Sequence, residues 1–330
     1  MKALALILRL ALGVLVAPAV TTAQPRGIFP RVGVLEPGSQ QRPTACLPAF
    51  QQGLRDLGYV EGQTIRLEYR YAEEQRDRLP ALAAELVQLA PDVIWLHTTT
   101  AALVAKRTIT TIPVVIGAST DLEELGIVAS LARPGGNLTG MDLRQLEVMK
   151  KQLELFKEAV PTISHVAVLV TPADPTISTT NRIPSNMAQE AQALGLQLQR
   201  IEAGAPEAFE TAFAAMVQGG ADALMITDNP FFARHLQRLL ELALRHRLPT
   251  MSGGRHYAEA GSLLAYGAYG PELCQLSAGF VDKILKGTKP ADLPVERAYK
   301  FYLDINLKTA EALGLTIAPT VLFRADKVIR

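Results

Sequence analysis

Apolar segments with strand periodicity alternate with segments of helical periodicity along almost the whole chain, and no other feature constrains the fold as strongly. In the first part of the chain these segments are, in order, Arg31–Leu35, Ala45–Leu57, Thr64–Tyr71, Arg78–Leu89, Asp92–Leu96, Thr100–Thr108 and Pro113–Ile116. A chain that repeats strand, helix, strand forms a mostly parallel sheet, because each helix carries the chain back to the start of the next strand. The sequence therefore predicts an α/β, doubly wound lobe.

The same alternation begins again near Gln145 and predicts a second doubly wound lobe. Its segments are Gln145–Ala159, His165–Val170, Asn181–Leu194, Gln197–Ile201, Glu207–Val217, Ala223–Ile226, Phe232–His246, Ser262–Tyr266, Glu272–Leu285, Lys300–Ile305 and Leu307–Leu313. A length of 330 residues is sufficient for two hydrophobic cores, and 48% hydrophobic with 20% charged residues is a globular composition.

The stretch between these two units has the pattern of a crossing between lobes. The strand Pro113–Ile116 ends in a polar loop, Gly117–Asp121, and a short helical segment follows. Proline and paired glycines in Arg133–Asn137 then stop the helix, and Leu138–Met141 begins a new extended segment.

The crossing also carries a resemblance. The pattern D-x-x-x-x-G-I-V-A-S-L-A-R-P-G-G-N-L-T-G, from Asp121 to Gly140, resembles the central signature of ABC transporter substrate-binding proteins related to tryptophan- and tyrosine-binding proteins. One residue departs from that signature, because Leu122 stands where the family usually has proline. Colinear segments elsewhere agree with the family, namely Gln51–Tyr59, Ile284–Gly287, Lys289–Pro294 and Ile305–Ala310.

This resemblance implies a type 1 periplasmic binding protein, with two Rossmann-like lobes joined by a multi-strand hinge and a ligand cleft between them. It implies an N-terminal lobe of residues 31–140 plus about 267–290, and a C-terminal lobe of about 141–266 plus 291–330. The late helix around Leu273–Leu285 would then return to the first lobe. The implied function is to close around a small molecule, an amino acid or a similar solute, and to deliver it to ABC transporter permease subunits.

The first residues have the composition of a signal peptide. Lys2 precedes the apolar run Ala3–Val16, and Thr21-Thr22-Ala23 supplies small residues for cleavage after Ala23. The alternative is an uncleaved anchor, although the apolar run is shorter than a membrane span requires. The formal net charge is +1, so no basic surface for nucleic acid is indicated. We expect a soluble, periplasmic monomer.

Ligands of open α/β sheets bind beyond the carboxyl ends of the strands, so the loops that follow the strands hold the candidate binding residues. These loops are rich in hydroxyl and amide groups, which suits a neutral-polar or zwitterionic ligand. The candidates are Ser39, Gln40, Thr98, Thr99, Thr100, Ser119, Thr120, Asp121, Asp228, Asn229, Tyr266 and Tyr269.

Several of these candidates have a structural alternative. The resemblance implies that Asp228-Asn229 holds the amino group of the ligand, but Asp228 is equally placed to cap the next helix. Thr98 to Thr100 can receive a carboxylate or cap a helix. Asp121 is expected at the hinge rather than on the ligand. Tyr266 and Tyr269 can form an aromatic wall or the edge of the core.

Enzyme signatures are missing from the sequence. There is no HExxH motif, no paired Cys/His spacing for zinc, no G-x-S-x-G elbow and no P-loop. His97, at the end of a strand, is the one catalytic candidate. We therefore expect no enzyme, metal or cofactor, and the alternative function is an exported enzyme or sensory receptor subunit on the same two-lobed fold.

The chain contains two cysteines, Cys46 and Cys274. An even number in an oxidising compartment permits one disulfide, and the alternative is two separate buried thiols. The resemblance places their two helices next to each other, which makes a bond geometrically accessible without requiring it.

Overall fold

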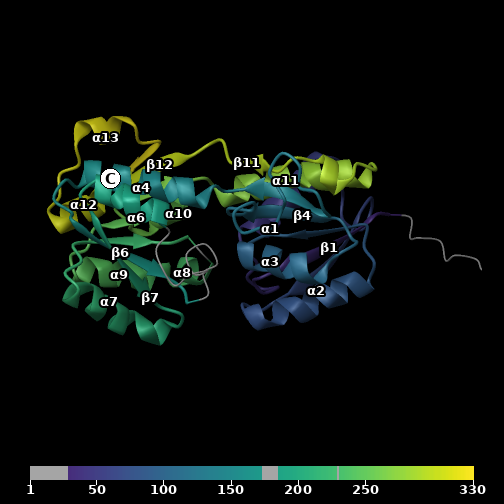
Figure 1. Cartoon of the computed structure of the whole chain (residues 1–330), viewed down its shortest axis with the longest axis horizontal. Helices are drawn as coiled ribbons and strands as arrows, with labels where there is room; N and C mark the ends of the chain where they lie inside the picture. The colour runs from purple at the N-terminus through teal and green to yellow at the C-terminus, as the bar shows by residue number, and fades with distance from the viewer. Residues whose placement is uncertain (1–28, 173–184, 229) are drawn as a thin grey trace, which may run out of the picture.

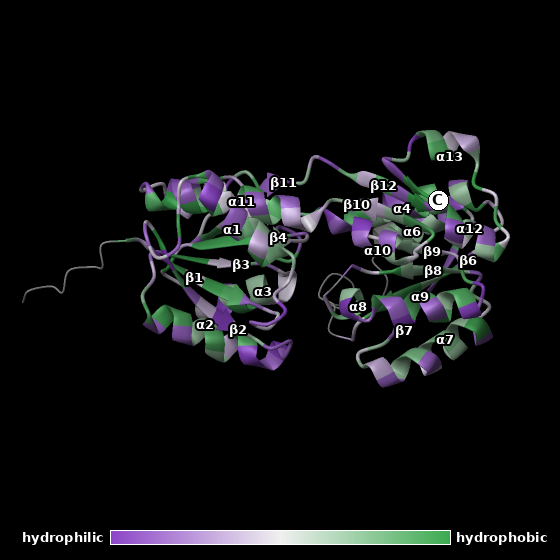
Figure 2. Ribbon diagram, turned by 180° about the vertical axis from the view of Figure 1, so that it is seen from behind, coloured by the Kyte–Doolittle hydropathy of each residue, from purple (hydrophilic) through white to green (hydrophobic). Residues whose placement is uncertain are grey.

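The computed structural model describes residues 29–172, 185–228 and 230–330, and it consists of two α/β lobes arranged side by side (Figure 1). The signal peptide expected at residues 1–23 lies outside the described residues. Helices α2 and α7, at the outer surface of the two lobes, alternate between hydrophobic and hydrophilic residues (Figure 2). This alternation is typical of helices with one face on a core and one in water.

The first lobe is built on a six-stranded parallel sheet with the order β11-β5-β4-β3-β1-β2. Its strands are β1 (Arg31–Glu36), β2 (Arg66–Tyr71), β3 (Val93–Leu96), β4 (Val114–Ser119), β5 (Leu138–Asp142) and β11 (Glu296–Arg297). Its helices are α1 (Cys46–Asp56), η1 (Arg76–Arg78), α2 (Leu79–Gln88), α3 (Thr99–Thr108), α11 (Gly270–Leu285) and η3 (Pro290–Asp292).

The second lobe is built on a seven-stranded sheet with the order β13-β12-β10-β9-β8-β6-β7, in which only the pair β10 and β12 is antiparallel. Its strands are β6 (His165–Val170), β7 (Gln197–Glu202), β8 (Ala223–Ile226), β9 (Thr250–Ser252), β10 (Leu264–Gly267), β12 (Tyr302–Asn306) and β13 (Lys327–Ile329). Its helices are α4 (Gln145–Ala159), α6 (Ser185–Ala193), η2 (Pro206–Ala208), α7 (Phe209–Gln218), α8 (Pro230–Arg234), α9 (Leu236–Arg245), α10 (Arg255–Ala260), α12 (Leu307–Leu313) and α13 (Pro319–Phe323).

Each sheet has a hydrophobic core on both faces, and one central strand of each, β3 and β8, is apolar at every position. In β3, Val93 and Trp95 join the core beneath α1 and α11, whereas Ile94 and Leu96 join the core beneath α2 and α3. The strand β8 of the second lobe divides its side chains between two cores in the same way. These continuous apolar runs are what made the strands recognisable in the sequence, and the two-lobed α/β fold predicted from them is confirmed.

Three segments, which we call the hinge, join the lobes (Figure 1). They are residues 143–144 after β5, residues 268–269 after β10, and residues 298–301 after β11. The second segment takes the chain back into the first lobe, where α11 packs against α1. The third differs from the boundary expected near residue 291, because Glu296–Arg297 still pairs with β5 of the first sheet.

Several further elements differ from the sequence-based expectation, and α10, α13 and β13 were not expected at all. The helix expected over Phe232–His246 is divided into α8 and α9, with His235 between them. The three-residue strand β9 was not expected, because a run of that length is too short to show a period.

A disulfide joins Cys46 of α1 to Cys274 of α11, with 5.3 Å between the two Cα atoms. The two helices lie so close because Gly53 has no side chain. A Cβ atom at Gly53 would lie 2.2 Å from the carbonyl oxygen of Gln275. Trp95 lies beneath this pair, where its ring stacks on Phe50 at 4.2 Å and its Nε1–H donates to Ser277 Oγ at 2.9 Å.

Candidate functional site

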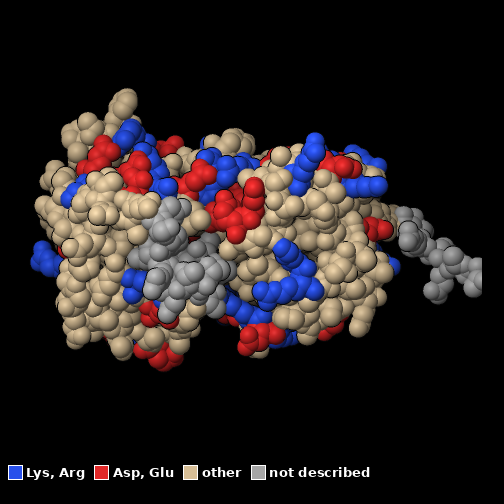
Figure 3. All heavy atoms as spheres, in the orientation of Figure 1, with Lys and Arg blue, Asp and Glu red and all other residues tan. Residues whose placement is uncertain are grey.

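A cavity of about 420 Å³, which we call the cleft cavity, lies between the two lobes at the carboxyl ends of their strands. Figure 3 shows a hollow between the lobes, with both basic and acidic side chains along it. Both lobes contribute to the lining of the cleft cavity. The lining residues are Pro37, Gly38, Thr44, Ala72, Glu74, Arg76, Asp77, Leu79, Thr98, Thr100, Thr171, Pro172, Gly204, Pro230, Phe231 and Arg234. Its volume falls in the range of small-molecule sites in proteins.

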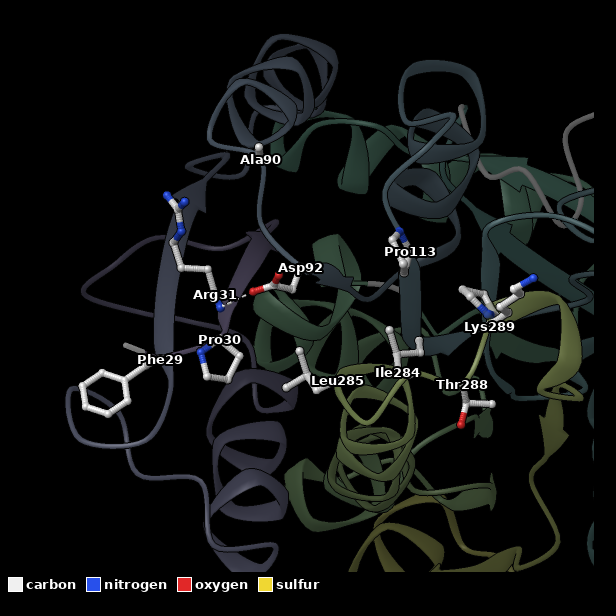
Figure 4. Close-up of a pocket in the computed structure, with 12 residues that line it drawn as sticks. Phe29, Pro30, Arg31, Ala90, Asp92, Pro113, Ile284, Leu285, Thr288 and Lys289 are labelled. Carbon is white, nitrogen blue, oxygen red and sulfur yellow. Dashed lines mark hydrogen bonds between the residues drawn. The ribbon is translucent and has the colours of Figure 1, made fainter. Parts of the chain in front are cut away.

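A second cavity, of about 510 Å³, is larger but lies at the amino ends of the first-lobe strands (Figure 4). There the backbone N–H of Arg31 donates to the Asp92 carboxylate at 2.8 Å, and Ile284, Leu285 and Lys289 line the opposite side. Because ligands of open α/β sheets bind at the carboxyl ends of the strands, the cleft cavity is the better candidate site.

The amino end of α3 forms one wall of the cleft cavity. Thr98 has a left-handed backbone with φ of 76°, and its hydroxyl caps the helix by accepting from the Ala101 N–H at 3.4 Å. Thr99 points elsewhere, since its Oγ1 accepts from Ser119 Oγ at 3.1 Å and from the Thr120 N–H at 3.3 Å. Thr98 and Thr100 therefore line the cavity, whereas Thr99 supports the loop beside it.

The loop after β1 is shaped by a buried cluster that contains Glu36, Thr44 and His97. The Glu36 carboxylate accepts from the N–H groups of Gly38 at 2.9 Å and Thr44 at 3.1 Å. Burial acts to raise the pKa of Glu36, but the charge of His97 and these hydrogen bonds outweigh it, so that the pKa lies below its ordinary value. Ser39 is buried in this loop and accepts from the Arg42 N–H at 3.1 Å, whereas Gln40 is exposed.

This cluster is not arranged as a nucleophilic triad. Thr44 Oγ1 lies 2.9 Å and Glu36 Oε2 lies 3.2 Å from the same atom, Nε2 of His97. In a triad the acid and the nucleophile contact opposite ring nitrogens, so that the acid orients the base. Here Glu36 and His97 hold the lining residues Gly38 and Thr44 in position.

Ser119, Thr120 and Asp121 lie beside the first segment of the hinge, where the Leu143 N–H donates to the Ser119 oxygen at 2.8 Å. Thr120 Oγ1 accepts from the Gln145 N–H at 3.0 Å and Asp121 Oδ1 from the Leu146 N–H at 3.4 Å, so both cap α4 of the other lobe. Burial raises the pKa of Asp121 to about 6, although the hydrogen bond from Thr120 acts to lower it.

Asp142, which sequence reasoning did not single out, completes this hinge network. It is buried, and its carboxylate accepts from the N–H groups of Leu122 at 2.9 Å and Arg144 at 2.7 Å. Leu122 is thus held by a hydrogen bond that its own N–H donates to Asp142, and proline at this position would lack that donor.

The two tyrosine candidates also lie next to the hinge. Tyr266 stacks on Phe301 at 6.0 Å, and its carbonyl oxygen accepts from the side chain of Gln152 at 2.7 Å. Tyr269 immediately precedes α11 and is half-buried. Neither is among the residues that line the cleft cavity.

Asp228 follows β8 at the edge of the second lobe and is exposed. It lies against Gly253, where an added Cβ atom would be 2.8 Å from the Cβ of Asp228. Asn229 lies outside the described residues. The lining of the cleft cavity on this side consists of Pro230, Phe231 and Arg234 of α8.

Sequence reasoning missed the charged lining residues Glu74, Arg76, Asp77 and Arg234. The first three follow β2, so the rule that ligands bind beyond strand ends would have found them had it been applied to that strand. Arg234 carried no comparable signal, because it lies a full helical turn into α8.

Two other features of the described residues bear on chemistry. No group of three or more His, Cys, Asp or Glu side chains among them is arranged to hold a metal ion. None of the helices in the described ranges is long and apolar enough to cross a membrane.

The chain is similar to a tyrosine-binding protein and to several proteins of known structure. It is 24% identical over 272 residues to the tyrosine-binding protein of Clostridioides difficile, which corresponds to 81% of this chain and 75% of that protein. A conserved domain protein from Vibrio cholerae superposes with a TM-score of 0.81 at 25% identity, covering 91% of this chain and 99% of that one.

Two further solved structures share the fold. An ABC domain from Streptococcus pneumonia in complex with L-Trp has a TM-score of 0.81 at 23% identity, covering 91% of this chain and 100% of that one. A ligand-free, open substrate-binding protein with adhesive properties from Clostridium difficile has a TM-score of 0.67 at 20% identity, with 91% and 99% covered. The sequence model of ABC transporter substrate binding proteins matches residues 31–329. The chain therefore belongs to the ABC transporter substrate-binding protein family.

Proposed function

We propose that this protein is an exported receptor that closes its two lobes around an amino-acid-like molecule and delivers it to the permease of an ABC importer. The observation that carries the proposal is the cleft cavity, which both lobes line at the carboxyl ends of their strands. A ligand in this position contacts both lobes only when they are closed, so its binding favours the closed state.

The lining of the cleft cavity suits a zwitterion with an aromatic side chain. The amino end of α3, with the hydroxyls of Thr98 and Thr100, is suited to a carboxylate. We propose that Asp228 accepts the ligand's ammonium group when the lobes close, and that Phe231 contacts its side chain. The names of the relatives, a tyrosine-binding protein and a domain in complex with L-Trp, support an aromatic amino acid.

We further propose that the leader is cleaved after Ala23 and that the mature protein acts in the periplasm as a monomer. The apolar run Ala3–Val16 and the small residues before Gln24 support this. N-terminal sequencing of exported protein tests the cleavage, because a chain that still begins at Met1 contradicts it.

The ligand is tested by thermal denaturation with a panel of amino acids and by mass spectrometry of any small molecule released from the purified protein. A ligand at 100 times its Kd adds about 2.7 kcal/mol to the free energy of unfolding. A panel with no stabilising amino acid, together with no released amino acid, contradicts the proposed ligand class.

The role of Asp228 is tested by Asp228→Asn. Loss of one partner of a buried charge pair costs on the order of 3 kcal/mol, or about a hundredfold in Kd, when the ligand carries an ammonium group. The matched control is Asp292→Asn, an exposed aspartate in η3. Equal affinity in the two variants, at equal melting temperature, removes Asp228 from the site.

A further inference from the structure

One ion pair connects the lobes across the cleft cavity. Arg234 Nη1 of α8, in the second lobe, contacts the Glu74 carboxylate from the loop after β2, in the first lobe. Both residues line the cavity, and their side chains are 30% and 31% exposed. The contact is therefore partly shielded from solvent and lies where the lobes separate.

The backbone holds Glu74 in place. Glu73 and Glu74 have φ of 52° and 67°, so two consecutive residues with side chains adopt the left-handed conformation that is normally left to glycine. Two hydrogen bonds maintain it, from the Glu73 N–H to the Gly38 oxygen at 3.1 Å and from the Glu74 N–H to the Pro37 oxygen at 2.9 Å. A conformation of this kind persists only where surrounding contacts determine it, and such positions cluster at ligand clamps and switches.

Arg234 is anchored just as firmly. Phe232, two residues earlier in α8, is fully buried in the core beneath α7 and α9. The ring of Phe231 lies 5.8 Å from that of Phe209 of α7 and 5.0 Å from that of His235, which follows α8. The ion pair thus joins two segments that are each held to their own lobe by further contacts.

We propose that Glu74 and Arg234 form an inter-lobe latch, which holds the ligand-free protein near its closed arrangement and so sets the fraction of molecules ready to retain a ligand. They are positioning residues and act through the lobe arrangement. The inference rests on the proposed function for its consequence in binding. The latch itself is tested without any ligand, so a failure of one is distinguishable from a failure of the other.

The expected effect follows from population arithmetic. Partly exposed ion pairs change an equilibrium by about two- to fivefold. Glu74→Gln should reduce the ratio of closed to open molecules by that factor. Where the closed form is the minor one, the apparent Kd rises by the same factor for every ligand, because every ligand is retained only by the closed form.

The experiment measures the distance between the lobes by electron paramagnetic resonance in ligand-free protein. Spin labels at Ala84→Cys and Ala214→Cys, exposed positions of α2 and α7, report opening because these helices lie on the same side of the two lobes (Figure 1). The variants are Glu74→Gln, Arg234→Gln and the charge reversal Glu74→Arg with Arg234→Glu. Glu73→Gln is the matched control, since it removes the same charge from the neighbouring position.

Each outcome decides for or against the latch. A shift to longer distances in Glu74→Gln and Arg234→Gln, its recovery in the charge reversal, and no shift in Glu73→Gln support it. Unchanged distances in both single variants overturn it. A rise in Kd only for ligands with an ammonium group, at unchanged distances, also overturns it and makes Glu74 a ligand contact. Circular dichroism confirms that each variant is folded, and either single variant suffices if the other fails to fold.

Discussion

Removal of the Cys46–Cys274 disulfide should destabilise this protein by about 5 kcal/mol. The bond closes a loop across a sequence separation of 228 residues. It joins α11, which returns to the first lobe after the strands of the second, to α1 near the start of the chain. In the chain-entropy model, a cross-link over that separation restricts the unfolded chain enough to contribute about 5 kcal/mol.

The corresponding change in melting temperature follows from the size of the chain. The unfolding entropy of roughly 300 residues is about 0.6 kcal/mol/K near 60 °C, so about 5 kcal/mol corresponds to about 8 °C. The comparison is between oxidised and reduced wild-type protein, with Cys46→Ala/Cys274→Ala as a second route to the same state. The reductant should have no effect on the double variant, which controls for unspecific action.

The assay is urea unfolding followed by tryptophan fluorescence. Trp95 is the single tryptophan of the chain and lies in the core beneath α1 and α11, next to the disulfide, so its emission reports on that part of the lobe. Thiol counting on denatured, unreduced protein establishes the starting state. Two free thiols per chain would refute the bond. No free thiols together with equal stability of the oxidised and reduced proteins would refute the entropy argument.

Two further changes test the hinge and the contact between α1 and α11. Burial raises the pKa of Asp121 to about 6, so the folded state binds this proton more tightly than the unfolded state and the free energy of unfolding should fall as the pH rises from about 4 to 6. Asp121→Asn should reduce this fall in the free energy of unfolding by at most roughly 3 kcal/mol. The measurement is urea unfolding of both proteins at pH 4 and 7. Identical pH dependence of the two proteins would contradict this. Gly53→Ala should destabilise by about 1–3 kcal/mol, because the new Cβ meets the Gln275 carbonyl oxygen at 2.2 Å. Gly279→Ala, in open space on α11, should instead be neutral or stabilising by up to about 1 kcal/mol, and the same sign at both positions would contradict the packing argument.

The candidate site was predictable only in part, and the reason is the kind of contact involved. A loop that follows a strand lies at the carboxyl edge of its sheet, and Thr98 and Thr100, selected on that basis, line the cavity, while their contact with a ligand stays a prediction. The same rule selected Thr120 and Asp121, which cap α4 of the second lobe, and only Asp121 was expected at the hinge. Which neighbour satisfies a hydroxyl or a carboxylate depends on the other lobe, and the local sequence contains no information about it.

By itself, the sequence determined the two α/β lobes, the apolar strands and the family, because strand and helix periods are local properties that each segment carries in its own residues. The tertiary structure alone decided that β11 remains in the first sheet, that Cys46 meets Cys274, and that Glu74 meets Arg234 across the cleft. These contacts join segments far apart in the chain. Their free energy comes from the packing of whole lobes, so no pattern within a few residues specifies them.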